Sequence, residues 1–359
     1  MNKSPFVLIM AGGVGSRFWP ASRENLPKQF LDISGAGKTL IQSTFDRFAS
    51  FIPSQNIYVI THENYKQQTI DSLPDLNPGN IITEPSRNNT AASIALGSFI
   101  LSQKNKEAIC IVAASDHIIS DALELERLME SACAHADAYQ CLVTLGIKPT
   151  RPDTGYGYME FSTDDDSAIR RVTSFREKPN ATDALFYMES GNFLWNSGIF
   201  IWRLVDILDA YKEFSPGIYE ILSRGENVYG TEGDQVFISS EYPKTEKIAV
   251  DYAILEKAKN VFAIPCDIGW SDLGTWNSLY DIHIKDENQN AILSTPVYLE
   301  NTNRTLIKSQ HDKLVVIKGL EDFIVVDTDD CLLIFPKVDE QKIKELKDNL
   351  RIEGLEQYL

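Results

Sequence analysis

The sequence has few residues suited to a metal or disulfide framework, and it has no long hydrophobic run. Its five cysteines include no C-x-x-C pair, and its five histidines form no H-x-x-x-H set. A zinc or disulfide framework is therefore not expected, and reduced thiols in a cytoplasmic protein are the favoured interpretation. The apolar run at residues 5–11 is too short for a signal peptide or a membrane span. We expect a soluble chain that does not contact a membrane.

Basic residues are also scarce. The 359 residues include 34 Lys and Arg against 51 Asp and Glu, which gives a formal net charge of −17. A protein this acidic repels nucleic acid and anionic membranes over most of its surface, so neither is expected as a partner. If the substrate is also an anion, its few cationic partners must be concentrated in one cleft and helped by a metal ion.

Short apolar runs alternate with amphipathic stretches through most of the chain. Buried strands are predicted at FVLIMA, NIYVIT, AICIVAAS, CLVTLGI and IFIWR, and helices at TLIQSTFDRFASF and ALELERLMESACAHADAY. This alternation indicates an α/β sheet covered on both faces, in which ligands collect at the carboxyl ends of the strands. We assign residues 1–284 to one domain built on this sheet, which we expect to be the catalytic domain.

Residues 285–359 have a different pattern. Closely spaced short strands with turn residues between them are predicted in STPVYLEN, RTLIKSQ, KLVVIKG, DFIVVDT and CLLIFPK, and a helix in VDEQKIKELKDNLR. No repeat is regular enough to indicate a solenoid. We interpret this region as a small β appendage ending in a helix. It either forms a homodimer contact or caps the main core, and both alternatives stay open.

Three glycines and two cations follow the first predicted strand, in MAGGVGSRFWP and the PKQF that comes after it. Glycines let phosphate approach backbone N–H groups that a Cβ would block. The segment matches neither the dinucleotide fingerprint nor the P-loop. Arg17 can fork onto phosphate oxygens and Lys28 can act as a point charge, so a triphosphate suits this loop. The alternative, two solvated surface cations, is less favoured because strand, glycines and cations occur together.

Acidic residues stand at two further strand ends. Asp116 ends the strand in ICIVAASDHII, and a divalent ion bound to phosphates would be an economical partner for it. The neighbouring His117 is given a structural role. DIGWSDLGTW offers Asp267 and Asp272 as a second carboxylate, although a helix N-cap is the alternative for Asp272.

A second group of polar residues occurs in TGYGYMEF, SFREKP and NFLWNSGIF. Glycines beside Tyr156 form a wall that a polyhydroxylated ligand can approach closely. Glu177 can accept from hydroxyls, and Lys178 can neutralise a second phosphate. Asn196 is another polar residue on an apolar support. Taken alone, Glu177 and Lys178 would more often be an exposed ion pair before a proline turn.

Together, these segments closely resemble the mannose-1-phosphate guanylyltransferases, or GDP-mannose pyrophosphorylases, of the sugar nucleotidyltransferase family. The matching segments, in one order over about residues 5–280, are AGGVGSRFWP with PKQF, EPSRNNTAASIA, SDHII, TGYGYMEF, FREKP, LWNSGIF, VDYAILEKA and GWSDLGTW. The resemblance implies an α/β fold with a Rossmann-like mixed sheet of the nucleotide-diphospho-sugar transferase (GT-A-like) type. In AASDH the family's proline before the acid is missing, so a small change at the strand exit is expected. No isomerase domain of the long bacterial forms is expected.

The resemblance also implies a reaction, in which GTP and α-D-mannose 1-phosphate give GDP-mannose and pyrophosphate with Mg²⁺ as cofactor. The implied nucleotide-binding residues are Ala11, Gly12, Gly13, Gly15, Glu84, Pro85, Asn89, Thr90 and Ser115. Those implied for the sugar phosphate are Gly155, Tyr156, Gly157, Glu177, Lys178 and Asn196. The implied catalytic cations are Arg17, Lys28 and Lys178, and the implied metal ligands are Asp116 and Asp272.

Two of these assignments involve a choice. Asp272 is favoured over Asp267 because related nucleotidyltransferases carry their second metal acid in a W-x-D-x-G pattern, which Trp270 to Gly274 match. Guanine is expected against EPSRNN, where Glu84 or backbone carbonyls could accept from N1–H and the 2-amino group.

Two alternatives to this function stay open. The same scaffold could use another base, or another hexose or a heptose 1-phosphate. A catalytically silent paralogue that binds GDP-mannose and regulates a partner should have lost a metal acid or a phosphate-binding lysine. All four such residues, Asp116, Asp272, Lys28 and Lys178, are present, so this alternative ranks second.

Overall fold

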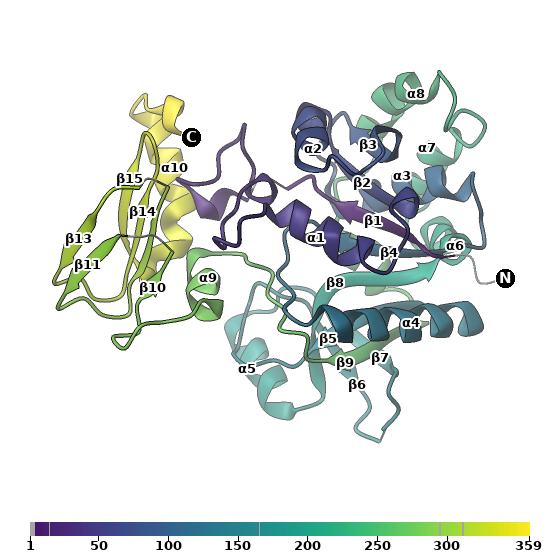
Figure 1. Ribbon diagram of the computed structural model, residues 1–359. Coiled ribbons are helices and arrows are strands. Elements are labelled where there is room, and N and C mark those ends of the chain that lie inside the picture. The colour runs from purple at the N-terminus through teal and green to yellow at the C-terminus, as the bar shows by residue number, and fades with distance from the viewer. Residues whose placement is uncertain (1–3, 14, 165, 294–295, 311) are drawn as a thin grey trace. The chain divides into compact units, whose positions relative to one another are not determined.

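The computed structural model describes residues 4–13, 15–164, 166–293, 296–310 and 312–359 (Figure 1). The chain forms two compact units. The first, called the sheet unit, comprises Met1–Gly12, Thr44–Ser115 and Ile119–Trp270. The second comprises Gly13–Ser43, Asp116–Ile118 and Ser271–Leu359. We call it the coil unit because its C-terminal strands wind in parallel turns. The extent of the catalytic domain, predicted to be residues 1–284, stays a prediction.

The described part of the sheet unit contains a nine-stranded sheet in the order β3-β2-β1-β4-β8-β5-β9-β7-β6. Neighbouring strands β3, β2, β1 and β4 are parallel, as are β5 and β9, whereas β8 runs antiparallel to both β4 and β5. The sheet is therefore mixed, as expected. Its strands are β1 (Phe6–Met10), β2 (Ile57–His62), β3 (Ile81–Glu84), β4 (Ile109–Ala114), β5 (Leu142–Ile147), β6 (Tyr158–Phe161), β7 (Arg170–Arg176), β8 (Phe193–Arg203) and β9 (Val261–Cys266).

Helices separate most of these strands along the chain. They are α1 (Leu40–Ala49), α2 (Lys66–Ser72), α3 (Asn89–Ser102), α4 (Ala122–Tyr139), α5 (Ala181–Ser190), α6 (Leu204–Phe214), α7 (Pro216–Ser223) and α8 (Asp234–Glu241). Helix α3 is buried on nearly all sides because it packs against α6 and α7 as well as the strands. Helix α4 packs on β4, β5 and β8 and lies in front of them in Figure 1.

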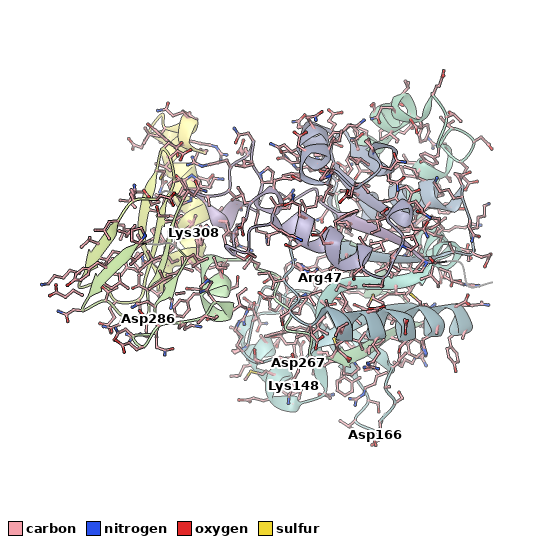
Figure 2. The ribbon with its side chains drawn as sticks, in the orientation of Figure 1. Arg47, Lys148, Asp166, Asp267, Asp286 and Lys308 are labelled. Atoms are coloured by element: carbon pink, nitrogen blue, oxygen red, sulfur yellow. The ribbon has the colours of Figure 1, made fainter. Side chains whose placement is uncertain are left out.

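The strand directions bring several carboxyl ends to one edge of the sheet. Because β8 is antiparallel to both β4 and β5, these two strands share the direction of β1, β3 and β9. At the ends of β5 and β9, Ile147 pairs with Cys266. The residues that follow, Lys148 and Asp267, lie at these neighbouring strand ends (Figure 2).

The C-terminal strands of the coil unit wind in parallel turns. Strands β10, β12 and β14 form one parallel sheet to which β15 is antiparallel, and β11 pairs with β13 in another. Partners lie 18 positions apart between β12 and β14 and between β11 and β13, as in Leu306 with Ile324 and Val297 with Val315, and 15 positions apart between β10 and β12. The expectation of no regular repeat is wrong here. The strands are β10 (Ala291–Ile292), β11 (Val297–Glu300), β12 (Leu306–Ser309), β13 (Val315–Lys318), β14 (Phe323–Asp327) and β15 (Leu332–Pro336).

The coil unit has a core of its own, which also holds part of the N-terminal segment. Helices α9 (Trp276–Ile282) and α10 (Ile343–Ile352) contribute to it. Trp276 packs edge-on against Phe18 with ring centroids 4.8 Å apart, and its Nε1 donates to Trp19 O at 3.1 Å. Buried Lys308, labelled in Figure 2, donates from Nζ to Asp32 O at 3.1 Å. The coil therefore supports the segment that carries Arg17 and Lys28.

Within the described residues, all five cysteines are free. No described helix is both long enough and apolar enough to cross a bilayer.

Candidate functional site

In the sheet unit, predicted nucleotide-binding residues lie where β1, β3 and β4 end. Ala11 N donates to Ile60 O at 2.8 Å, which ties the exit of β1 to β2. Ser115, after β4, is buried and donates from N to Met10 O at 3.0 Å. A Cβ on Gly12 would lie 3.2 Å from Glu84 Oε2, so Gly12 passes close to this carboxylate. Ala11, Gly12, Glu84 and Ser115 are thus brought to one edge of the sheet.

Glu84 is a buried carboxyl at the end of β3, with 4% of its surface exposed. Its Oε1 accepts hydrogen bonds from the hydroxyls of Ser93 and Tyr242. Burial raises the pKa of Glu84 by more than these hydrogen bonds and the charge of Arg87 lower it. Oε2, the oxygen beside Gly12, is therefore the better candidate to accept a hydrogen bond from a nucleobase. The guanine role of Glu84 stays a prediction.

The segment that follows Glu84 and Pro85 is anchored through its asparagines. Asn88 is fully buried and donates from Nδ2 to the carbonyls of Tyr242 and Thr245, both at 3.0 Å. Asn89 has a φ of 65° and an exposed side chain, and its Oδ1 accepts from Thr90 N at 2.8 Å. Thr90 Oγ1 accepts from Val250 N at 2.9 Å. The backbone of this segment is therefore well fixed beside the buried Glu84.

The predicted sugar-phosphate residues meet where β6 begins, where β7 ends and in the first half of β8. Lys178 N donates to Tyr156 O at 3.2 Å, and Asn196 N donates to Gly157 O at 2.8 Å. A Cβ on Gly157 would lie 2.4 Å from Glu177 Oε2, so a larger residue here would displace this carboxylate. Gly155 lies next to Tyr156, and its N donates to Asp153 Oδ1 at 2.8 Å.

Glu177 and Lys178 form an ion pair of unequal burial. Lys178 Nζ lies 2.7 Å from Glu177 Oε1, with side chains 56% and 7% exposed respectively. Burial lowers the pKa of Lys178, but the hydrogen bond and charge of Glu177 and the charge of Asp251 raise it by more. The ammonium is therefore cationic at neutral pH, and its exposure allows it to meet an anion.

Two acids on the segment VDYAILEKA, to which the sequence pattern assigns no role, contact this group of residues. Asn196 Nδ2 donates to Asp251 Oδ1 at 2.9 Å, and Glu177 N donates to Glu256 Oε1 at 3.2 Å. The two acids share one face because η7 (Asp251–Leu255) is π-helical, with Glu256 N donating to Asp251 O. A period of 3.6 residues would have separated them. The only signal in the sequence was the presence of two acids, Asp251 and Glu256, in one short segment.

In the coil unit, Lys28 joins the two predicted metal acids. Only 4% exposed, it lies in η2 (Lys28–Phe30). Its Nζ lies 2.8 Å from Asp116 Oδ2 and donates to Asp272 O at 3.2 Å and to Leu273 O at 2.7 Å. These three acceptors match the three N–H donors of an ammonium. The structure thus brings Lys28, Asp116 and Asp272 together, while the phosphate-binding role of Lys28 stays a prediction.

The glycines and Arg17 occupy the loop before Lys28. Gly15 has a φ of 64°, and a Cβ there would lie 2.4 Å from Lys28 Cβ, so a side chain is excluded twice. Gly13 has no atom within 4 Å of the corresponding position and is open. Arg17, in η1 (Ser16–Phe18), is exposed and has no hydrogen-bond or ion-pair partner among the described residues. Its guanidinium is available to an anion.

Asp272 and Asp267 belong to different units. Asp272 belongs to the coil unit with Asp116, whereas the exposed Asp267 belongs to the sheet unit. The N-cap of α9 is Thr275, whose hydroxyl accepts from Ser278 N, so the N-cap alternative for Asp272 is wrong. Asp272 instead turns back on its own loop, where its Oδ1 accepts from Gly274 N at 3.1 Å.

The donor set around Lys28 fits a hard divalent cation that takes the rest of its ligands from elsewhere. Burial raises the pKa of Asp116, but the charges of Lys28 and His117 lower it by more, so this carboxylate is ionised at neutral pH. Among the described residues, no group of three or more His, Cys, Asp or Glu could hold a metal ion. Two carboxylates completed by substrate phosphates and water are a usual arrangement for Mg²⁺.

Comparisons with known proteins agree along the whole chain. The model of the nucleotidyl transferase family matches residues 6–289, and that of a MannoseP isomerase/GMP-like beta-helix domain matches residues 297–350. The chain is 34% identical over 372 residues to mannose-1-phosphate guanylyltransferase 2 of Escherichia coli O157:H7, covering 100% of this chain and 76% of that protein. It is 35% identical over 361 residues to the mannose-1-phosphate guanylyltransferase of Salmonella montevideo, covering 98% and 75%.

A solved structure shows the same architecture. It is described as mannose-1-phosphate geranyltransferase from Thermus thermophilus and matches with a TM-score of 0.87 at 27% identity, covering 97% of this chain and 100% of that chain. The predicted α/β fold with a C-terminal β region is thereby confirmed. The family model and the curated relatives together show that this chain belongs to the nucleotidyl transferase family.

Proposed function

We propose that this protein transfers GMP from GTP to α-D-mannose 1-phosphate, giving GDP-mannose and pyrophosphate. The observation that carries this proposal is the similarity, over the full chain, to proteins named mannose-1-phosphate guanylyltransferase. The pattern of side chains supports it. One group combines an open glycine loop, an exposed arginine and two acids, and another combines a lysine with acceptors for hydroxyls.

The reaction needs alignment and charge neutralisation more than it needs a general base. A phosphate monoester is already ionised near neutral pH, so its oxygen can attack without losing a proton to the protein. This oxygen forms a bond to the α-phosphorus of GTP while the bond to the β-phosphate oxygen breaks and pyrophosphate leaves. Arg17 holds the β- and γ-phosphates and stabilises the departing charge, and Lys178 holds the phosphate of the sugar in line.

Asp116 and Asp272 are the residues that would hold Mg²⁺. The ion would neutralise charge on the α-phosphate and on the incoming phosphate. Lys28 orients the Asp116 carboxylate, which it contacts, and it also donates to the backbone carbonyl of Asp272. With its three donors engaged in this way, Lys28 contributes positive charge to the phosphate site at a fixed position.

The sugar and the base are recognised by the remaining predicted residues. Glu177 and Asn196 bond the hydroxyls of mannose, and the Gly155–Gly157 backbone forms the wall beside them. Glu84, through Oε2, accepts from guanine N1–H or the 2-amino group, with Pro85, Asn89, Thr90 and Ser115 completing the nucleotide site. GTP is available in the cytoplasm, which is where we expect the reaction to take place.

We further propose a homodimer. Apolar side chains are exposed on the strands of the coil unit, and Tyr298 and Val316, 58% and 61% exposed, are paired across β11 and β13. Leu332 and Ile334 are exposed on β15. Large exposed apolar side chains in a row are typical of an interface. Light scattering should give twice the chain mass for the wild type and a monomer for Val316→Lys; a monomeric wild type would contradict this proposal.

The function is tested by pyrophosphate release from purified protein. GTP, ATP, UTP, CTP and dTTP are each combined with mannose, glucose, galactose and heptose 1-phosphates in the presence of Mg²⁺. We expect the highest kcat/KM for GTP with mannose 1-phosphate. A higher value for another pair would replace the substrate assignment. A folded protein that binds GDP-mannose but releases no pyrophosphate with any pair would show a silent binding protein instead.

A further inference from the structure

The amide of Asn196 is held on both sides by side-chain and backbone groups of the sheet unit. Its Oδ1 lies 3.1 Å from Thr144 Oγ1 and accepts from Gly198 N at 3.2 Å. Because the backbone N–H of Gly198 can only donate, the acceptor end of the amide must face it. Nδ2 therefore faces Asp251, whose Oδ1 accepts from it at 2.9 Å. One N–H of Nδ2 is used in this bond, and the second remains for a ligand.

The same acid lies beside the Glu177–Lys178 pair. The charges of Glu177 and Lys178 both act on Asp251, and Asp251 in turn acts on Lys178. The π-helical turn that presents Asp251 also presents Glu256, whose Oε1 accepts from Glu177 N. One short turn thus holds both the amide expected to meet the sugar hydroxyls and the loop expected to meet the sugar phosphate.

We propose that Asp251 is a positioning residue of the sugar-phosphate site, where it fixes the Asn196 amide and sets the charge beside Lys178. This inference rests on the proposed function, because it concerns how the sugar phosphate is bound. Asp251 acts through Asn196 and Lys178 and need not touch the substrate itself. The role deepens the site assignment with a residue that sequence patterns had left without one.

The protonation of Asp251 gives the proposal a second measurable consequence. Burial first, and then the charge of Glu177, raise the pKa of Asp251 to about 7. Below that pH the side chain is neutral and still accepts from Asn196. Above it, the side chain adds a negative charge near Lys178, which weakens the attraction for an anionic sugar phosphate.

The other ionisable groups around Asp251 are Glu177 and Lys178 after β7, Tyr252 and Glu256 on its own turn, and Tyr211 on α6. The pKa of Lys178 is raised, so its ammonium stays charged between pH 6 and 8. Burial raises the pKa of both tyrosines above their ordinary value, so neither titrates in this range. Asp251 is thus the group whose charge is expected to change there.

The experiment compares steady-state kinetics of the full-length wild type, Asp251→Ala and Asp251→Asn. Asp209→Ala, which removes an exposed acid on α6, is the matched control. Asp251→Ala should raise KM for mannose 1-phosphate about tenfold, the effect of losing one hydrogen bond to a charged group, while KM for GTP changes less than about twofold. Asp251→Asn keeps an acceptor for Asn196, so it should restore KM to near the wild-type value.

The pH series then separates positioning from packing. Between pH 6 and 8 the wild-type KM for mannose 1-phosphate should rise relative to that of Asp251→Asn, which carries no ionisable group at this position. The second ionisation of the substrate phosphate affects both proteins equally, so it cancels in the ratio of the two KM values. A ratio that does not change with pH would overturn the charge part of the proposal.

Other outcomes are equally decisive. Asp251→Ala with both KM values unchanged, or with both raised by the same factor, would overturn the positioning role while the proposed function stood. If Asp251→Ala does not fold, as judged by its melting temperature, the pH series of Asp251→Asn and Asp251→Ser decides. A wild type inactive with every substrate pair would instead contradict the proposed function, and this inference with it.

Discussion

Lys28 and Lys178 were both predicted to bind phosphate, but their surroundings differ. Lys28 is 4% exposed and holds Asp116 and two backbone carbonyls of the coil unit. The Lys178 side chain is 56% exposed and pairs with Glu177 in the sheet unit. A buried ammonium with three fixed acceptors is a preorganised charge, whereas an exposed one can turn toward an arriving anion. Replacing each of the two lysines should therefore have a different effect on substrate binding.

Lys178→Ala is expected to weaken the use of mannose 1-phosphate and to leave GTP binding nearly intact. Lys28→Ala should weaken GTP binding and raise the Mg²⁺ requirement, because Asp116 loses the charge that orients its carboxylate. Each substitution should cost about 2–4 kcal/mol of transition-state stabilisation, typical of removing a preorganised charge. Substrate titrations at several Mg²⁺ concentrations measure both effects. Equal losses of GTP affinity in the two variants, without a selective effect on the sugar, would refute this division.

Asp272 and Asp267 form a second comparison. Asp272→Asn should lower turnover by orders of magnitude and raise the Mg²⁺ requirement, because a metal carboxylate is lost. Asp267→Asn should stay close to the wild type, since Asp267 is exposed and lies outside the W-x-D-x-G pattern. Turnover across a Mg²⁺ series is the measurement, with melting temperature as the folding control. An active Asp272→Asn beside a folded but inactive Asp267→Asn would reverse the assignment.

Residues at strand ends could be placed from the sequence, but residues on the π-helical turn could not. Asp116 could be placed because buried strands are recognisable and their ends are where ligands collect, whereas Glu84 and Ser115 came only from the family resemblance. Asp251 was missed because a π-helical turn has no apolar periodicity of its own. The burial of Lys28 was also beyond sequence patterns, because its partners Asp116 and Leu273 are distant in the chain.

At the scale of elements, helices with a clear period of apolar residues were predicted well, whereas the parallel β-strand turns of the coil unit were not. The stretch predicted as a helix at residues 122–139 is α4, with the same bounds. The parallel turns of the coil unit escaped notice because the repeat of 18 positions is carried by strands of only four or five residues. The apolar positions paired across turns, such as Leu306 with Ile324, were the signal that could have revealed it.

The coil core should be essential to the glycine loop. Trp276 is fully buried against Phe18 and donates to Trp19 O, so Trp276→Ala should cost about 3–5 kcal/mol of folding free energy. Trp276→Phe keeps a ring there and should lose only about 1 kcal/mol with the missing hydrogen bond. Denaturant unfolding of both variants and the wild type is the measurement. Equal stability of the two variants would show that the aromatic contact does not hold the coil core together.

At the scale of the molecule, the charge of −17 places strong demands on a protein with two anionic substrates. Long-range attraction cannot bring such substrates in, so binding must rely on local cations and on charge neutralisation by a metal ion. The described cations of the predicted site fit this demand. Arg17 is exposed without a partner among the described residues, Lys178 is exposed, and Lys28 is buried and paired with Asp116. Composition predicts that such cations are concentrated in one cleft, and this stays a prediction.

The central claim is that an oxygen of mannose 1-phosphate attacks the α-phosphorus of GTP. Mannose 1-phosphate carrying ¹⁸O in its phosphate oxygens tests this directly, with GDP-mannose and pyrophosphate analysed by mass spectrometry after reaction with the purified wild type. All of the label should appear in GDP-mannose and none in pyrophosphate, because the bonds within the sugar phosphate stay intact. Label in pyrophosphate, or no labelled GDP-mannose from an active protein, would contradict the account.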